Sequence, residues 1–151
     1  MLAEYIALLN IVEGFNEQSL VIKGWSITIG MAALIAMYSR ASSENGSRLG
    51  VLLAAFATVP FYLTDVLWKT FQQPYAERLT AMEEFVRYAP GSAHPGPLQS
   101  WSEWGDSYDE DKVMDFLCAM MNLSVLMPHC VIFAVGLLLA IFFPPNRQGR
   151  Y

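Results

Sequence analysis

The sequence has few charged side chains and few groups that bind metals or perform covalent catalysis. Only 15% of its 151 residues are charged, whereas 54% are hydrophobic. It contains two cysteines and two histidines, and their positions do not have the spacing of a zinc site. The sequence also lacks a glycine-rich phosphate loop and a nucleophile with an obvious base. We therefore expect no enzymatic activity, no catalytic residues, no metal and no cofactor.

Basic residues are outnumbered by acidic ones. Nine Lys and Arg stand against 14 Asp and Glu, which gives a formal net charge of −5 at pH 7. Phosphate contacts need clustered basic side chains, so this balance disfavours nucleic acid as a bulk electrostatic partner. A local basic pocket formed between subunits is compatible with the same composition.

The hydrophobic residues are concentrated in three long segments. A helix needs about 20 apolar residues to cross the roughly 30 Å hydrocarbon core of a bilayer. Residues 20–38, 49–68 and 116–143 meet this requirement. Three spans of this size leave no room for a separate soluble core. We predict one all-α integral membrane domain, residues 1–151, with three transmembrane helices.

The segments outside the spans also have helical patterns. Residues 1–18 alternate apolar and polar side chains at helical spacing, which predicts an amphipathic helix. This helix either lies at the membrane surface or extends the first span. Residues 69–112 are predicted to lie outside the membrane. There the second span, kinked at Pro60, continues as a polar helix that is broken or bent at Pro74.

An acidic loop with aromatic residues precedes the third span. One interpretation is a solvated linker whose aromatic side chains anchor at the membrane interface. The other is a gating or partner surface at the mouth of a channel, where acids concentrate cations. The candidate residues of this surface are Trp101, Trp104, Asp109, Glu110 and Asp111.

Asp115, Asn122, His129 and Gly136 recur every seven residues in the third span. Such spacing returns a helix to nearly the same face, with a drift of about 20° per repeat. Ionisable groups at membrane depth are costly and usually face a bundle interior or a water-filled path. Two interpretations follow. These residues either bond to neighbouring helices of the same chain, or they line a pore surrounded by several copies.

Lys23 and Asp65 are charged residues within the first two spans. The turn between the spans centres near Glu44, at equal distance from both (44 − 23 = 21 and 65 − 44 = 21). In antiparallel helices the two side chains therefore reach the same depth, and an ion pair would offset their desolvation. Lys69, one turn after Asp65, is a competing partner. We predict a structural Lys23–Asp65 ion pair.

Residues 19–28, Ser-Leu-Val-Ile-Lys-Gly-Trp-Ser-Ile-Thr, carry a resemblance to a known group. The chain resembles small bacterial inner-membrane proteins whose first span opens with Ser-x-x-x-Lys-Gly-Trp-x-x-Thr. The likeness covers roughly residues 19–87 and continues at Leu63-Thr64-Asp65, Glu77-Arg78-Leu79 and Val86-Arg87, with Thr64 where the group usually has Leu. Such proteins occur with anti-phage systems, and the chain is similar to the Hailong-type membrane channel effector.

The resemblance implies an oligomeric channel whose opening depolarises an infected cell. It also implies gating by a regulatory nucleotide or oligonucleotide signal, or by the enzyme that makes it. Because three helices cannot enclose an aqueous path by themselves, we expect a symmetric homo-oligomer, with a tetramer favoured. Its expected location is the lipid of the bacterial inner membrane, as a multi-pass protein with a cytosolic N-terminus.

A second interpretation remains open. A non-conducting membrane anchor or accessory subunit would bind a partner protein through the amphipathic helix and the acidic loop. A small-molecule transporter is less favoured, because no inverted repeat is visible between the two halves of the sequence.

Overall fold

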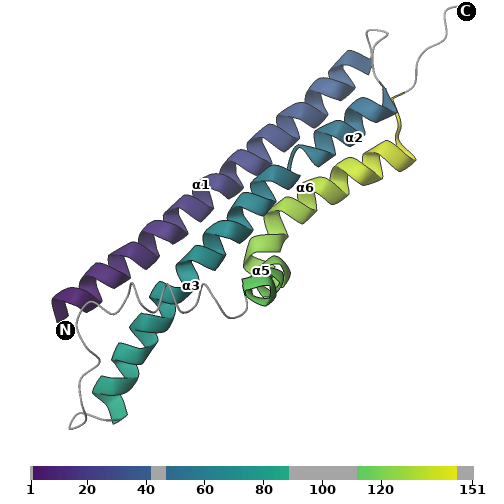
Figure 1. Cartoon of the computed structure of the whole chain (residues 1–151). Coiled ribbons are helices and arrows are strands. Elements are labelled where there is room, and N and C mark those ends of the chain that lie inside the picture. Colours follow the sequence, from purple (N-terminus) through teal and green to yellow (C-terminus); the bar gives the residue numbers. More distant parts are fainter. Residues whose placement is uncertain (1, 42–46, 89–111, 146–151) are drawn as a thin grey trace, which may run out of the picture. The chain divides into compact units, whose positions relative to one another are not determined.

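The structure is a computed structural model that describes residues 2–41, 47–88 and 112–145, in which every regular element is a helix. The helices are α1 (Leu2–Ala41), α2 (Arg48–Phe56), α3 (Val59–Tyr88), α5 (Lys112–Met121) and α6 (Leu123–Phe142) (Figure 1). Three helical stretches, Leu2–Ser39, Arg48–Tyr88 and Leu123–Phe142, are long and apolar enough to cross a membrane. The prediction of an all-α membrane protein with three spans is confirmed.

The chain divides into two compact units. Unit 1 comprises Met1–Ser19 and Val66–Ala119, and unit 2 comprises Leu20–Asp65 and Met120–Tyr151. The amphipathic segment 1–18 and the first span are parts of one helix, α1. Of the two arrangements that the sequence allowed for residues 1–18, the structure has the helical extension of the first span.

The second span is interrupted by a short turn at Ala57 and Thr58, between α2 and α3. The Thr58 hydroxyl donates a hydrogen bond to the Ala55 carbonyl at 2.9 Å, which satisfies an acceptor at the end of α2. Pro60 is the second residue of α3, where its missing N–H breaks no intrahelical bond. The irregularity expected at Pro60 therefore lies just before it. The break allowed at Pro74 does not occur, and α3 continues through it to Tyr88.

The third span differs from the prediction of one continuous helix over residues 116–143. Asn122 has an extended backbone (φ −66°, ψ 120°) and caps the N-terminus of α6. Its Oδ1 accepts hydrogen bonds from the Ser124 backbone N–H at 3.0 Å and from the Ser124 hydroxyl at 2.9 Å. An Asn side chain competes with the helix for backbone donors in this way. The stretch therefore forms two helices, and Asp115 lies on α5 while His129 and Gly136 lie on α6.

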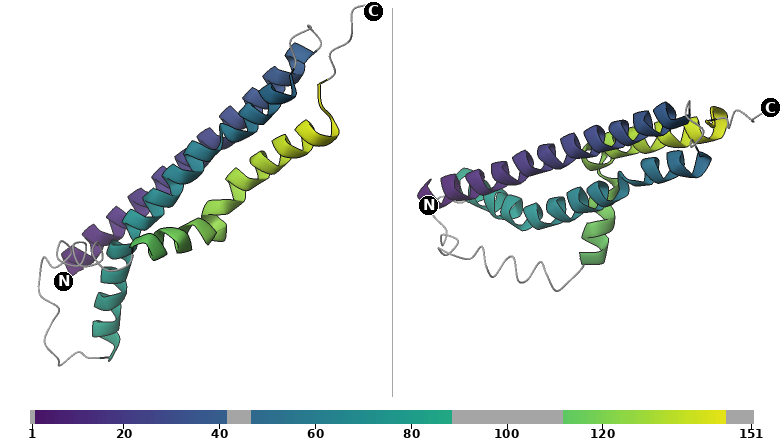
Figure 2. Two further views of the ribbon diagram at one scale, coloured as in Figure 1. Left: turned by 45° about the vertical axis from the view of Figure 1, so that its right-hand side comes forward. Right: turned by 90° about the horizontal axis from the view of Figure 1, so that it is seen from above.

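The core of unit 2 is built from small and medium apolar side chains on α1, α2 and α6. Its buried residues are Leu34, Val51, Ala54, Ile132 and Ala140. α2 packs along α6, as Figure 1 shows. The single proton of the Tyr38 hydroxyl is shared between the carbonyls of Phe143, at 2.6 Å, and Leu139, at 3.2 Å. These bonds fix the C-terminal end of α6, yellow in Figure 2, to the end of α1.

Two glycines allow the helices of unit 2 to approach closely. A Cβ atom added at Gly30 would lie 2.6 Å from Cγ2 of Ile132, and one added at Gly136 would lie 2.6 Å from Cβ of Ala55. Small residues at helix contacts are typical of membrane bundles, where close packing replaces the hydrophobic effect as the driving force. Gly136 is therefore a packing residue within unit 2.

Unit 1 is held by larger side chains and by polar contacts between α1 and α3. Leu8, Leu79 and Met82 form its buried core. Arg78, only 1% exposed, pairs with Glu4 at 3.3 Å between Nη2 and Oε1. Buried Gln72 donates hydrogen bonds from Nε2 to the Val12 carbonyl at 3.0 Å and to the Asn16 side chain at 2.8 Å. Such polar contacts fix the register of the two helices more narrowly than apolar packing does.

Candidate functional site

The predicted partners Lys23 and Asp65 meet in unit 2. The Lys23 Nζ lies 3.2 Å from Oδ2 of Asp65. The Asp65 side chain is 1% exposed and that of Lys23 is 18% exposed. The carboxylate is therefore removed from solvent, whereas the long lysine side chain still reaches the surface of the unit. Lys69, the competing partner, instead donates to Oε1 of Gln72 at 2.7 Å.

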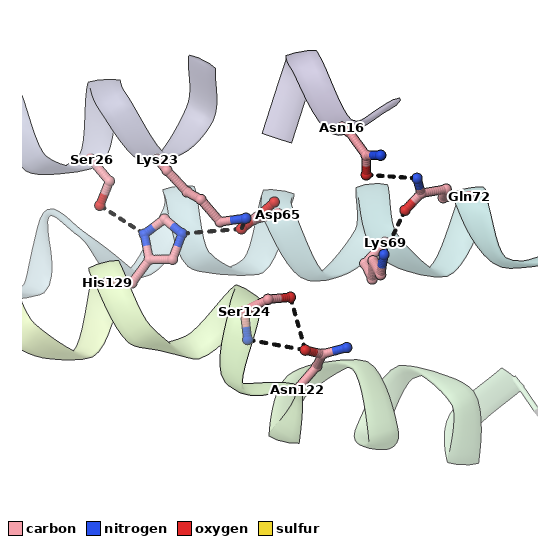
Figure 3. Close-up of polar contacts among 9 residues, drawn as sticks. All are labelled: Asn16, Lys23, Ser26, Asp65, Lys69, Gln72, Asn122, Ser124 and His129. Carbon is pink, nitrogen blue, oxygen red and sulfur yellow. Dashed lines mark hydrogen bonds and ion pairs between the residues drawn. The ribbon is translucent and has the colours of Figure 1, made fainter. Parts of the chain in front are cut away.

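His129 joins this pair from α6. Its Nδ1 lies 2.8 Å from the Ser26 hydroxyl, and its Nε2 lies 3.4 Å from Oδ2 of Asp65 (Figure 3). The imidazole is almost completely buried. We call these four residues, Lys23, Ser26, Asp65 and His129, the polar cluster. Its members come from α1, α3 and α6, so the cluster joins the three helices that cross unit 2.

The contacts of the polar cluster indicate which imidazole tautomer fits. A neutral ring that carries its proton on Nε2 donates to the ionised Asp65 and accepts from the Ser26 hydroxyl at Nδ1. Both ring nitrogens then have a partner. The same Oδ2 atom of Asp65 faces the Lys23 ammonium and the His129 ring, so two donors share one acceptor.

An apolar cavity of about 290 Å³ lies beside His129 in unit 2. Tyr62 stands at its wall, with its ring centroid 5.8 Å from that of His129, and its hydroxyl donates to the Met120 carbonyl at 2.8 Å. The remaining lining residues are Thr58, Val59, Leu63, Met120, Cys130 and Phe133. The imidazole thus lies between a charged partner and an apolar space.

Four residues were predicted to share one face of the third span, and the structure separates them. His129 and Gly136 are buried on the packing face of α6, Asn122 is exposed at its cap, and Asp115 is half-buried on α5. His129 and Gly136 therefore follow the first of the two interpretations, in which they contact neighbouring helices. A role for any of the four in lining a pore between copies stays a prediction.

The candidate gating or partner residues of the acidic loop lie outside the described part of the chain. These are Trp101, Trp104, Asp109, Glu110 and Asp111. Their proposed role stays a prediction as well.

Ser26 is a member of the polar cluster that the sequence analysis did not identify. It follows Lys23 by three residues, so the two share one face of a helix. Its polar side chain one turn from Lys23 is the signal in the sequence that points to it. Its pairing with α6 had no signal in the sequence, because local spacing does not specify which helix packs against which face.

The Ser26–His129–Asp65 contacts resemble the order of a nucleophile, a base and an acid. Ser26, however, is fully buried, at 0% exposure, so its hydroxyl is closed to a substrate in this conformation. Among the described residues, no group of three or more His, Cys, Asp or Glu could hold a metal ion. The arrangement is suited to holding charge and a proton between helices.

Comparison of the chain with known protein families, with curated proteins and with solved structures finds no match.

Proposed function

We propose that this chain is the subunit of an oligomeric ion channel of the bacterial inner membrane, a defence effector that depolarises the cell when it opens. In this proposal the polar cluster holds unit 2 closed. The observation that carries it is the burial of Asp65 and His129, with Lys23 paired to Asp65, among helices of membrane-spanning length and composition.

Burial of such a cluster within membrane spans costs free energy. Ionisable side chains within spans are costly and are typically found where ions or protons move. A protein that only had to hold its helices together could replace a buried ion pair with apolar side chains at no loss of stability. Retaining charge in unit 2 therefore favours a function that uses charge over a purely structural one.

The packing of unit 2 favours an ion path between copies of the chain over one through the interior of a single copy. Gly30 and Gly136 leave no room even for an added Cβ, so the interior they occupy holds no aqueous path. The polar side chains of Asn122 and Ser124 are exposed at the start of α6 and could face a lumen. His129 would reach that lumen only after α6 turns away from α1 and α3. The resemblance over residues 19–87 supports a nucleotide or oligonucleotide signal, or the enzyme that makes it, as the trigger of opening.

The test is ion flux through purified protein in liposomes. We expect a wild-type flux that changes in Asn122→Leu and His129→Leu, the first through the path and the second through the closed state. Met127→Leu is the matched control, because Met127 is exposed on α6, two residues from His129. Absence of flux in the wild type under every trigger tested, together with a monomeric state in detergent, would contradict the proposal.

One observation favours a second candidate, a non-conducting anchor or accessory subunit. Leu2, Ile6 and Leu9 are exposed along one face of α1 in unit 1. Such a stripe fits a partner protein. A single copy of the chain recovered with a bound partner, without ion leak from liposomes, would support this candidate over the channel.

A further inference from the structure

We infer that α5 is an anchor at the membrane surface. In this inference the helix lies along the lipid bilayer and inserts its exposed face at the boundary between the headgroups and the acyl chains. The partner of that face is lipid, and burial of apolar side chains, not charge, holds it there. The inference rests on the membrane spans of the chain and not on conduction.

The exposed side chains of α5 form one apolar face. Those that the structure describes are Val113, Met114, Leu117, Cys118 and Met121. At 100° per residue, these five fall within one arc of about 140° around the helix. Among residues 113–121, whose side chains the structure describes, the one charged group, Asp115, is half-buried and lies outside this arc. A helix in water has the opposite arrangement, with its apolar side chains inside and its charged ones outside.

Contacts at Gly30 indicate where the middle of the bilayer lies in unit 2. A Cβ atom added there would lie 2.6 Å from Cγ2 of Ile132 and 3.0 Å from Cγ2 of Thr58. The three residues are close to the centres of the first two predicted spans and of α6, at (20 + 38)/2 = 29, (49 + 68)/2 = 58.5 and (123 + 142)/2 = 132.5. The three spans therefore share one midplane at this contact.

The start of α6 then lies at the edge of the hydrocarbon. Half of a core of about 30 Å is covered by roughly ten helical residues. Leu123, the first residue of α6, precedes Ile132 by nine residues (132 − 123 = 9). The span is therefore complete without α5, and a straight continuation of α6 would place α5 beyond the hydrocarbon core.

The backbone at Asn122 interrupts such a continuation. Its extended conformation (φ −66°, ψ 120°) separates α5 from α6 at the membrane boundary. An upright α5 of 10 residues would carry its apolar arc about 15 Å through the headgroups into water. A helix along the surface keeps the whole arc at one depth, about 5–10 Å into the boundary of headgroups and acyl chains. The Tyr62 hydroxyl, which donates to the Met120 carbonyl at 2.8 Å, fixes the last turn of α5 to α3.

Lipid is the partner of the arc because the arc is continuous with the exposed surface of α6. Met121 is 78% exposed and Leu123 is 67% exposed, with only Asn122 between them. The exposed apolar side chains of a helix that crosses the bilayer meet acyl chains, so the same solvent is available to α5. The five residues of the arc include no Lys or Arg. Binding therefore depends on apolar insertion and not on attraction to anionic headgroups.

The experiment measures the depth of α5 with nitroxide spin labels on single cysteines. The full chain is reconstituted in phosphatidylcholine vesicles, and the collisions of each label are compared for oxygen, which concentrates among acyl chains, and for a nickel chelate, which stays in water. Val113→Cys, Leu117→Cys and Met121→Cys are each made in a chain whose native cysteines are replaced by Ala. The three positions lie four residues apart on one face, so we expect the same shallow depth for all three. An upright α5 would separate successive labels by about 6 Å.

Two further labels give the depth scale. Native Cys130, labelled in Cys118→Ala, lies two residues from Ile132 and marks the hydrocarbon. Glu84→Cys, in the chain without native cysteines, is at an exposed position of unit 1 and marks water. Native Cys118, labelled in Cys130→Ala, belongs to the apolar arc and should have the depth of the series. This last measurement needs no introduced cysteine, so it does not depend on how the three cysteine variants fold.

Three results would overturn the inference. A depth that changes by a constant step from residue 113 to residue 121 means that α5 stands upright. Nickel collisions as frequent as those of Glu84→Cys mean that the arc faces water. Rare collisions with both reagents mean that protein covers the arc, either a second copy of the chain or another partner.

Conduction is tested separately by ion flux. A chain that conducts while the arc of α5 faces water would keep the channel and lose the anchor. A chain with α5 at one shallow depth, but without flux under every trigger tested and monomeric in detergent, would do the reverse.

Discussion

The two units of the chain differ in the side chains that they bury and in those that they expose. Unit 1 buries large side chains together with Gln72 and Arg78. Most of the charged side chains that the structure describes in this unit are exposed, among them Glu13, Glu17, Glu77, Glu83, Glu84 and Arg87. Unit 2 buries small residues and a polar cluster. Its exposed side chains include Ile27, Ile35, Leu53, Phe56, Val131 and Leu138.

The prediction that residues 69–112 lie outside the membrane fits this difference. In water, burial of Leu8, Leu79 and Met82 stabilises a helix pair through the hydrophobic effect. In hydrocarbon that driving force is lost, and close contact of small residues and polar bonds between helices take its place. Unit 2 has the pattern expected of helices in a bilayer, and unit 1 has the pattern expected of helices in water with an apolar stripe at the end of α1.

The largest expected difference in stability is between two substitutions, each of which alters the ion pair of one unit. Asp65→Asn leaves Lys23 and His129 without their shared carboxylate and should lower the free energy of unfolding by about 3–5 kcal/mol. Glu4→Gln keeps an acceptor oxygen beside buried Arg78 and removes a charge at a partially exposed position, so it should lower that free energy by about 1 kcal/mol. Both are measured by denaturant unfolding in detergent micelles, followed by circular dichroism. Equal losses would remove the distinction between the two pairs.

Glycine replacements should change stability in opposite directions in the two units. Gly136→Ala places Cβ 2.6 Å from Cβ and 3.2 Å from Cα of Ala55, and should destabilise unit 2 by about 1–3 kcal/mol. At Gly14, in the unit 1 part of α1, an added Cβ meets nothing within 4 Å. Gly14→Ala should therefore stabilise the helix by up to about 1 kcal/mol. Thermal unfolding of the two variants checks the signs, and the same sign for both would contradict the packing described for Gly136.

The smallest expected difference in stability is between the removal of two tyrosine hydroxyls, one in each unit. Tyr38→Phe removes donation to two carbonyls at the end of α6 and should destabilise the protein by about 1 kcal/mol. Tyr5→Phe removes an exposed hydrogen bond to Glu83, 2.7 Å long, and should have less than about 0.5 kcal/mol of effect. Hydrogen exchange of the last amides of α6 gives a local readout, because their protection should fall in Tyr38→Phe and stay unchanged in Tyr5→Phe.

Much of this architecture follows from patterns in the sequence. The three spans could be predicted from the length of their apolar runs, and the meeting of Lys23 with Asp65 from their equal distance to Glu44. The same rule relates Tyr5 and Glu83 in unit 1 (44 − 5 = 39 and 83 − 44 = 39), whose side chains are hydrogen-bonded. Antiparallel helices joined by a short turn have a register that numbering alone can give.

The helix break at Asn122 and the neighbours of the His129 side chain could not be predicted in this way. Asn122 lies in an apolar run without Gly or Pro beside it, and only its side-chain bonds to Ser124 identify it as a cap. The heptad spacing places His129 and Gly136 on one face of α6, but it does not say whether that face meets another helix or water. That choice depends on contacts with Ser26, Asp65 and Ala55, which are distant in sequence.

The glycine contact has a mechanical consequence for α6. In its C-terminal half the helix is held by the close packing of Gly136 against Ala55, a contact without charged groups. Near its N-terminal half it is held by Ile132 against Gly30 and by the His129 imidazole, which contacts the Asp65 carboxylate. Loss of the Asp65 carboxylate should therefore loosen the start of α6, near Asn122, more than its Phe143 end, which Gly136 and Tyr38 hold without charged groups.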